Sequence, residues 1–117
     1  MIAAANIFDA MPAGAACEDE QVMPVLTRPG VQIERIVSAG RASPPGFWYD
    51  QAWDEWVIVL AGSARLRFED EAGARQFGPG DYVLIPAHAR HRIDWTSPDQ
   101  PTVWLAMHFR DEPGTTS

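Results

Sequence analysis

The chain has 117 residues, of which 46% are hydrophobic, so it predicts one domain with a modest apolar core. Its formal net charge of −7 argues against the clustered positive surface that binding to nucleic acid or to an anionic membrane requires. All nine basic residues are arginines, which excludes a lysine Schiff base, and the single cysteine, Cys17, excludes an intrachain disulfide.

The first segment, residues 1–24, is expected to be irregular, because small residues dominate it and Pro12, Gly14 and Pro24 interrupt it. Its beginning contains Asp9 and lacks the lysines or arginines that open a signal peptide. No apolar run approaches the roughly 20 residues that a transmembrane helix needs. A cytoplasmic location is therefore expected.

Residues 25–110 are expected to form a single barrel, because turn signals rich in glycine and proline recur along them at short intervals. No segment shows the apolar spacing of an amphipathic helix, and the regular turns are typical of an all-β sandwich or barrel. The polar tail, residues 111–117, is expected to be frayed. The expected strands are residues 31–37, 46–51, 56–60, 64–69, 81–85, 91–95 and 102–109.

Alternation along the expected strands predicts which side chains point inward. In residues 64–69 the apolar side chains are even-numbered and the charged ones are odd-numbered. In residues 91–95, His91 shares its face with Ile93 and Trp95, so His91 is expected to point into the barrel. The run after Glu55 is apolar on both faces, which is typical of a strand covered on both sides. A partner subunit is one such cover, and a homodimer is expected.

Two sequence patterns resemble the two motifs of the cupin superfamily. Residues 80–91 follow the second motif, in which a glycine, a proline, a second glycine and a histidine recur at fixed spacing, although His88 replaces the second glycine. Glu55 and Gly62 match the final half of the first motif. The resemblance covers roughly residues 40–109 and is nearest to small single-domain bacterial cupins. It implies an all-β cupin double-stranded β-helix, or jelly-roll, barrel.

The resemblance also implies a metal site. Cupins with a complete first motif bind one divalent metal through three histidines and one glutamate, and Glu55 and His91 stand at two of those positions here. Neither upstream histidine is present. The expected cofactor is one divalent ion, such as Zn, Ni, Fe or Mn. The expected ligands are Gln51, Glu55 and His91, with Tyr49, Asp50 and His108 as additional or alternative ligands.

The register of the upstream segment decides which of its side chains enter the cavity. With one spacing the missing histidine positions fall on Tyr49 and Gln51, and with the other they fall on Trp48 and Asp50. Tyr49 and Gln51 are favoured as the inward pair, because that spacing occurs in cupins with Glu-Trp at the motif glutamate. Asp50 would be the stronger metal ligand, so both registers stay open.

Two functions remain in competition. In the first, the metal serves an oxygenase, isomerase or lyase that acts on a small molecule. In the second, the metal site is lost, and Glu55 and His91 form a buried acid–imidazole pair in a ligand-binding or sensor module. Other polar candidates are less specific: His108, His88, Asp54, Arg90 and Arg92 are each also consistent with a loop, a turn or a solvated face, and Trp48, Trp53 and Trp95 with the core or an interface.

Overall fold

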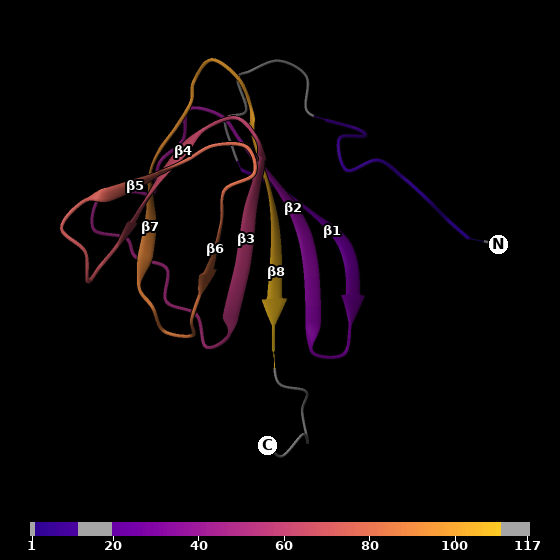
Figure 1. Ribbon diagram of the computed structural model, residues 1–117, viewed down its shortest axis with the longest axis horizontal. Helices are drawn as coiled ribbons and strands as arrows, with labels where there is room; N and C mark the ends of the chain where they lie inside the picture. The colour runs from indigo at the N-terminus through magenta and orange to yellow at the C-terminus, as the bar shows by residue number, and fades with distance from the viewer. Residues whose placement is uncertain (1, 12–19, 111–117) are drawn as a thin grey trace.

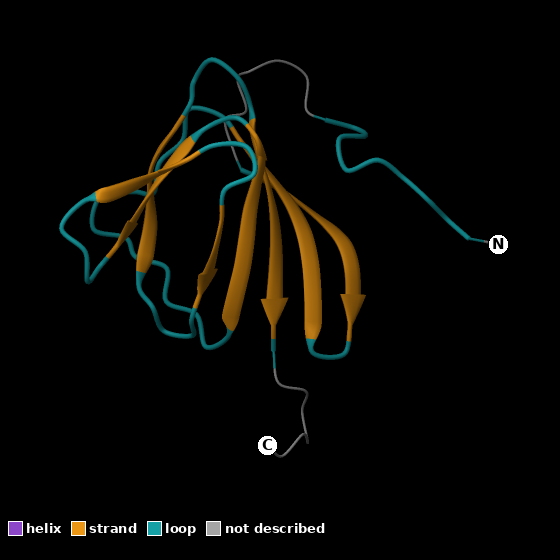
Figure 2. Ribbon diagram, in the orientation of Figure 1, coloured by secondary structure: helices purple, strands orange, loops and turns teal. Residues whose placement is uncertain are grey.

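The computed structural model describes residues 2–11 and 20–110. In these residues the chain forms two antiparallel sheets joined by loops, with no helix (Figures 1 and 2). The prediction of an all-β jelly-roll fold is therefore confirmed. The tail that was expected to be frayed, residues 111–117, and Cys17 lie outside the described residues.

The larger sheet has five strands in the order β1-β2-β8-β3-β6, and the smaller sheet has three in the order β5-β4-β7 (Figure 1). Neighbours in both sheets are antiparallel although many are distant in sequence, which is the connectivity of a jelly roll. The strands are β1 (Gln21–Arg28), β2 (Val31–Ser38), β3 (Asp54–Ala61), β4 (Ala64–Phe68), β5 (Ala74–Phe77), β6 (Tyr82–Ile85), β7 (His91–Thr96) and β8 (Thr102–Phe109).

Three elements differ from the sequence prediction. Strand β1 begins at Gln21, inside the segment that was expected to be irregular, and contains Pro24 next to a register shift. An edge strand tolerates such a proline because its missing N–H weakens no central ladder. Strand β5 was not predicted, because only Phe77 among its four residues is buried. Residues 46–51 do not form the expected strand: only Tyr49 pairs, in an isolated bridge to His91.

The core lies between the two sheets and is built by alternating side chains. The predicted inward residues of β4 are buried, and they meet apolar side chains from β3 and β8. Val59 and Ala106 are fully buried, so the centre of the larger sheet is enclosed on its inner face. The buried cluster consists of Val57, Val59, Ala64, Leu66, Phe68, Phe77, Ile85, Trp104 and Ala106.

A β-bulge in β7 shows that the prediction of a shared inward face for His91, Ile93 and Trp95 was wrong for Trp95. Trp95 pairs with Arg65 and Ile93 pairs with Leu66, so Asp94 is the extra residue between them. The Arg65 guanidinium lies 5.0 Å from the centre of the Trp95 ring, on the outer side of the smaller sheet. Trp95 therefore does not share the face of His91. The extra residue shifts the alternation by one position.

Gly62 shows why the first motif ends in glycine. It links β3 to β4 with φ of +88°, and an added Cβ would lie 2.5 Å from the Cα of Thr102. Both the left-handed backbone and the contact with the neighbouring strand therefore require glycine. This turn fixes how the chain passes from β3, which carries Glu55, into β4 of the smaller sheet.

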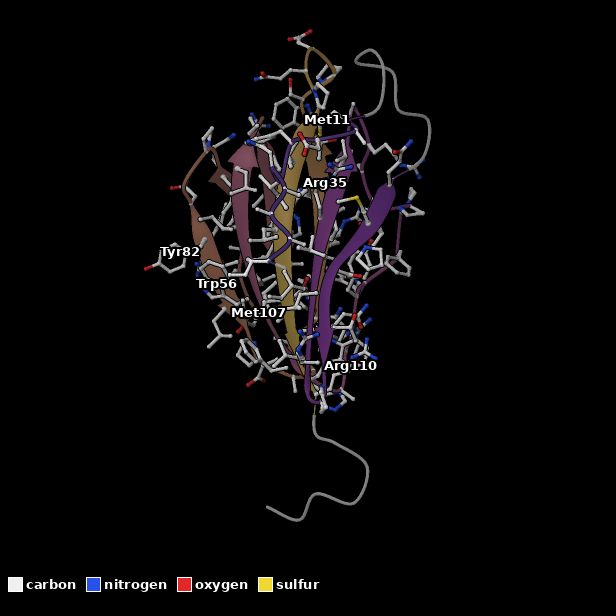
Figure 3. All side chains as sticks on the ribbon, turned by 90° about the vertical axis from the view of Figure 1, so that its right-hand side faces the viewer. Met11, Arg35, Trp56, Tyr82, Met107 and Arg110 are labelled. Carbon is white, nitrogen blue, oxygen red and sulfur yellow. The ribbon has the colours of Figure 1, made fainter. Side chains whose placement is uncertain are left out.

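The outer face of the larger sheet is rich in apolar side chains. Because Glu55 and Val57 point inward, Trp56 points outward, where it meets Tyr82 at a ring-centre distance of 5.4 Å (Figure 3). Arg35 is also on this face and is only 3% exposed. Its guanidinium donates to the carbonyl oxygens of residues 7, 9 and 10, at 3.1, 2.5 and 3.4 Å, so the N-terminal segment lies against the sheet.

Within residues 2–11 and 20–110, no helix is long and apolar enough to cross a membrane.

Candidate functional site

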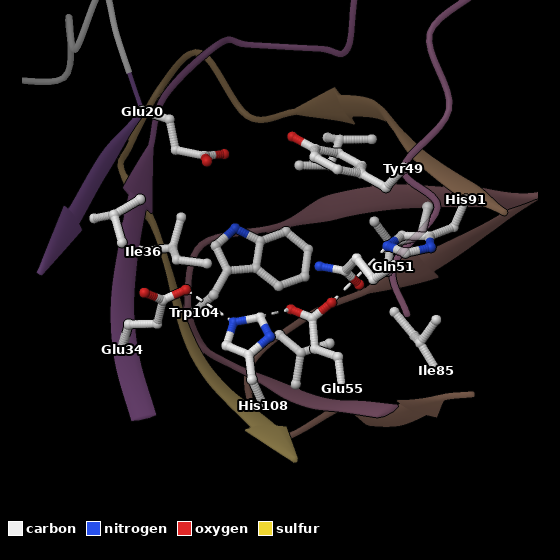
Figure 4. Close-up of a pocket in the computed structure, with 14 residues that line it drawn as sticks. Glu20, Glu34, Ile36, Tyr49, Gln51, Glu55, Ile85, His91, Trp104 and His108 are labelled. Carbon is white, nitrogen blue, oxygen red and sulfur yellow. Dashed lines mark hydrogen bonds and ion pairs between the residues drawn. The ribbon is translucent and has the colours of Figure 1, made fainter. Parts of the chain in front are cut away.

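A cavity of about 170 Å³ lies between the sheets (Figure 4). Its apolar lining comes from the core, and its polar side chains come from two directions. It is smaller than the roughly 300 Å³ at which drug-sized pockets begin, so it suits a small metabolite. The polar residues that line it are Glu20, Glu34, Tyr49, Gln51, Glu55, His91 and His108.

One polar wall of the cavity, which we call the sheet wall, consists of Glu34, Glu55 and His108 on β2, β3 and β8. Glu55 and His108 are direct neighbours across the β3–β8 pair. The Nε2 atom of His108 lies 2.8 Å from Oε1 of Glu34 and 4.0 Å from Oε2 of Glu55. The sheet therefore fixes all three side chains through strands that are paired along their length.

Trp53 determines the protonation of His108. The indole Nε1 of Trp53 donates to Nδ1 of His108 at 2.8 Å. An indole N–H only donates, so Nδ1 carries no proton and Nε2 carries the proton that is donated to Glu34. His108 is therefore a neutral imidazole with both ring nitrogens in hydrogen bonds.

The other polar wall, which we call the loop wall, consists of Tyr49, Gln51 and His91. The backbone of Tyr49 pairs with that of His91 through hydrogen bonds of 2.7 and 3.1 Å, and their rings stack at 5.4 Å. The Tyr49 and Gln51 side chains line the cavity, which is the register favoured by the sequence. The two residues of the alternative register lie elsewhere. Asp50 is exposed and contacts His88, and Trp48 lies beside Arg90.

His91 is held in the opposite way to His108. Its Nδ1 lies 2.8 Å from the carbonyl oxygen of Ala89, which only accepts, so Nδ1 carries a proton. The remaining nitrogen, Nε2, faces Oε1 of Glu55 at 3.9 Å. Neutral His91 therefore presents a lone pair to the cavity, next to the Glu55 carboxyl group.

Burial shapes the acidity of the cavity. Burial raises the pKa of Glu55, and Glu34 adds to that rise. Positive charge on His108 or His91, when either is protonated, and a hydrogen bond from Gln51 lower the pKa. Burial also raises the pKa of Tyr49, with further contributions from Glu20 and Glu55. Tyr49 is therefore a neutral phenol at neutral pH.

Two acidic residues of the cavity were not identified from the sequence. Glu34 lies two residues before Ile36 in β2, and both line the cavity, so alternation along that strand was the signal that could have found it. Glu20 precedes β1, so no alternation of side chains along a strand predicts which way it points. It is exposed as a residue, and its carboxylate points into the cavity (Figure 4). Burial raises the pKa of Glu20, and Arg41 opposes that rise.

The remaining polar candidates lie outside the cavity lining. His88 has a φ of +65° at the position of the motif's second glycine, and it is exposed. Arg90 pairs with Glu69 at 2.8 Å. Arg92 donates to Asp94 and to the backbone of residues 43 and 44. Asp54 accepts from the backbone N–H of residue 87, which fits its expected role in a turn.

The residues of the cavity do not fit a resident transition metal. A histidine that binds metal usually donates through its other ring nitrogen, and His91 satisfies this condition whereas His108 does not, because Trp53 cannot accept. The three main ligands expected from the sequence are Glu55, His91 and the amide oxygen of Gln51, and only two of these are strong ligands. Across the described part of the chain, no three His, Cys, Asp or Glu side chains are grouped to hold a metal ion.

Comparisons with known proteins agree with this fold. A family model described as a cupin domain matches residues 35–108. No match is found among curated proteins.

Among solved structures, a candidate mannose-6-phosphate isomerase from Ralstonia eutropha JMP134 is 49% identical, with a TM-score of 0.88, and the match covers 93% of this chain and 99% of that one. A polyketide cyclase from Streptomyces resistomycificus has a TM-score of 0.73 at 18% identity, covering 97% and 82%. A cupin superfamily protein from Desulfitobacterium hafniense DCB-2 has a TM-score of 0.68 at 22% identity, covering 84% of each chain. The last two similarities concern the fold alone.

Proposed function

This chain belongs to the cupin family, and from that premise we propose that it binds a small molecule between its sheets without a resident metal ion. The observation that carries the proposal is the hydrogen bond from Trp53 to His108, which withholds the one further histidine that could complete a metal site. What faces the cavity is an acid–imidazole pair, Glu55 and His91, beside the stacked ring of Tyr49. Such a pair can donate to a ligand, accept from it, or transfer a proton.

Metal analysis of the purified protein tests the proposal. We expect substoichiometric divalent metal, and we expect treatment with a chelator to leave the melting temperature unchanged. Binding of small polar molecules by the chelated protein, measured by calorimetry, would support the ligand site. Glu55→Gln keeps the shape of the side chain and removes its charge, so it is the matched variant for these binding measurements.

The opposite result would favour the metal site expected from the sequence. Near-stoichiometric metal that is lost in both Glu55→Ala and His91→Ala would assign Glu55 and His91 as ligands and would overturn the proposal.

Catalysis is a second candidate function, and one observation favours it. The relative from Ralstonia eutropha is described as a candidate isomerase of a phosphorylated sugar, and it covers nearly the whole of this chain. The Glu55–His91 pair contains the two types of group that move protons in isomerisations. Formation of fructose 6-phosphate from mannose 6-phosphate, lost in Glu55→Gln, would support this function.

The homodimer expected from the sequence is also a proposal. Apolar side chains on the outer face of the larger sheet are exposed, with Tyr82 at 64% and Leu84 at 55%, and β1 leaves one edge of that sheet unpaired among the described residues. A second copy of this chain would cover both features, since homodimer interfaces resemble a divided core. Light scattering after size exclusion should give twice the monomer mass, and Leu84→Glu should reduce it to the monomer.

A further inference from the structure

Apart from two imidazoles and one phenol, the ionisable side chains that line the cavity are carboxylic acids. Glu20, Glu34 and Glu55 line it, and among the described residues no lysine or arginine does so. His108 contributes no positive charge, because Trp53 holds it as a neutral imidazole. The potential inside the cavity therefore favours a cation and disfavours a phosphate.

Arg41 does not reverse the sign of the electrostatic potential inside the cavity. It lines a smaller neighbouring cavity that shares Glu20, Tyr49 and Ile93 with the main one, and its interaction with Glu20 opposes the effect of burial on the pKa of that group. Arg41 also has interactions of its own within the protein. Arg41 therefore attracts one carboxylate of the cavity and is not among the residues that line the main cavity.

A second observation points to a ligand in the same place. Trp104 is only 4% exposed, and its indole Nε1 is buried with no hydrogen-bond partner among the residues that the structure describes. Trp104 lines the cavity, and its ring nitrogen points into it, toward Glu20 (Figure 4). A buried N–H without a partner is destabilising, and a ligand oxygen placed there would remove that cost.

We propose that the cavity takes a small hydroxylated amine in its cationic form, of the amino-sugar or amino-alcohol class, and discriminates against phosphorylated sugars. The ammonium group binds among the carboxylates near Glu20, and an oxygen of the ligand accepts from Trp104 Nε1. The remaining hydroxyl groups donate to Glu55. This inference rests on the proposed function, since it names the ligand class of the same cavity, and it opposes the second candidate function, whose substrate is a phosphorylated sugar.

Three sugars with the same ring stereochemistry and different charge test the inference: mannosamine, mannose and mannose 6-phosphate. Calorimetry on the chelated full-length protein at neutral pH should give an affinity for mannosamine at least fivefold above that for mannose. Mannose 6-phosphate should bind at least tenfold more weakly than mannose. The order of affinities is the readout, so it does not depend on the absolute value for any one sugar.

Two variants separate the contributions of charge and hydrogen bonding. Glu20→Gln should abolish the preference for mannosamine over mannose while leaving mannose binding within twofold. Trp104→Phe should weaken both sugars equally, by about two- to tenfold, which is the range of one neutral hydrogen bond. Glu69→Gln is the matched control, because Glu69 pairs with Arg90 on the surface, away from the cavity lining. It should change none of these affinities.

Tighter binding of mannose 6-phosphate than of mannose would overturn the inference, as would equal affinities or no binding of mannosamine. None of these outcomes alters the metal content or the response to a chelator, on which the proposed function depends. Stoichiometric metal in the cavity would instead overturn the proposed function. The order of affinities for the three sugars is measured separately, so the two failures can be distinguished.

Discussion

The sheet wall and the loop wall of the cavity differ in how their side chains are held. The sheet wall comes from strands that are paired along their length, and its histidine, His108, uses both ring nitrogens in hydrogen bonds. In the loop wall, His91 begins strand β7, and the segment with Tyr49 and Gln51 pairs with it only through an isolated bridge from Tyr49 to His91. The two imidazoles are nevertheless almost equally far from Glu55, with their Nε2 atoms at 4.0 and 3.9 Å.

The difference shows that distance alone does not identify a metal ligand. His91 and His108 are equally buried neighbours of one carboxyl group, and only the partner of each second nitrogen distinguishes them. A carbonyl oxygen behind His91 leaves Nε2 able to accept, whereas an indole N–H behind His108 makes Nε2 a donor. The sheet wall is therefore built for hydrogen bonding, and the loop wall keeps the reactive nitrogen.

The largest expected effect comes from breaking the sheet wall. Glu34→Ala removes the acceptor of the His108 Nε2–H and leaves a buried donor without a partner, so the free energy of unfolding should fall by about 2 kcal/mol. Tyr49→Phe removes one hydroxyl from the loop wall and should cost less than about 1 kcal/mol. Urea denaturation of both variants checks this, and equal losses would contradict the comparison.

The next effect removes the difference between the two histidines. Trp53→Phe frees Nδ1 of His108, so that the ring can exchange its tautomer and offer Nε2 as a third ligand beside Glu55 and His91. Zinc affinity, measured by competition with a chelating dye, should rise about tenfold, since a second-sphere partner typically changes metal affinity by 10- to 100-fold. Trp56→Phe on the outer face is the control and should leave the affinity unchanged.

The third effect is a pH dependence centred on Glu55. Its raised pKa means that the folded state binds the proton more tightly than the unfolded chain, whose value is near 4.5. The cost of ionising Glu55 in the fold is absent below that value and grows as pH rises through the raised pKa. Glu55→Gln should therefore become progressively more stable relative to the wild type as pH rises, as measured by chemical denaturation in a pH series. A constant difference would contradict this.

The smallest effect tests strain beneath the loop wall. His88 occupies a left-handed backbone position where the family motif has glycine, so His88→Gly should relieve about 1 kcal/mol of strain. The lost contact with Asp50 is exposed and offsets little of that gain. Thermal denaturation should show a rise in melting temperature of a few degrees, and a fall would mean that the histidine stabilises the loop.

The sheet wall and the loop wall were each only partly predictable, for physical reasons. Alternation and turn chemistry predicted the strands of Glu55 and His108, because side chains on a paired strand follow a period of two. The same rule failed at Trp95, where one bulged residue shifts the period, and at residues 46–51, where prolines and glycine precede a single bridge. The tautomer of His108 was beyond sequence analysis, since it depends on Trp53, a residue 55 positions away.

The contact between Arg35 and the N-terminal residues has a practical consequence for protein engineering. The carbonyl oxygens of residues 7, 9 and 10 accept from this buried guanidinium, so the segment solvates a charge that lies within an apolar surface. A truncation that starts after Met11 would leave this cation with three hydrogen bonds fewer, and it would lower both stability and solubility. Purification tags at this end therefore need a spacer that lets residues 7–10 reach the sheet.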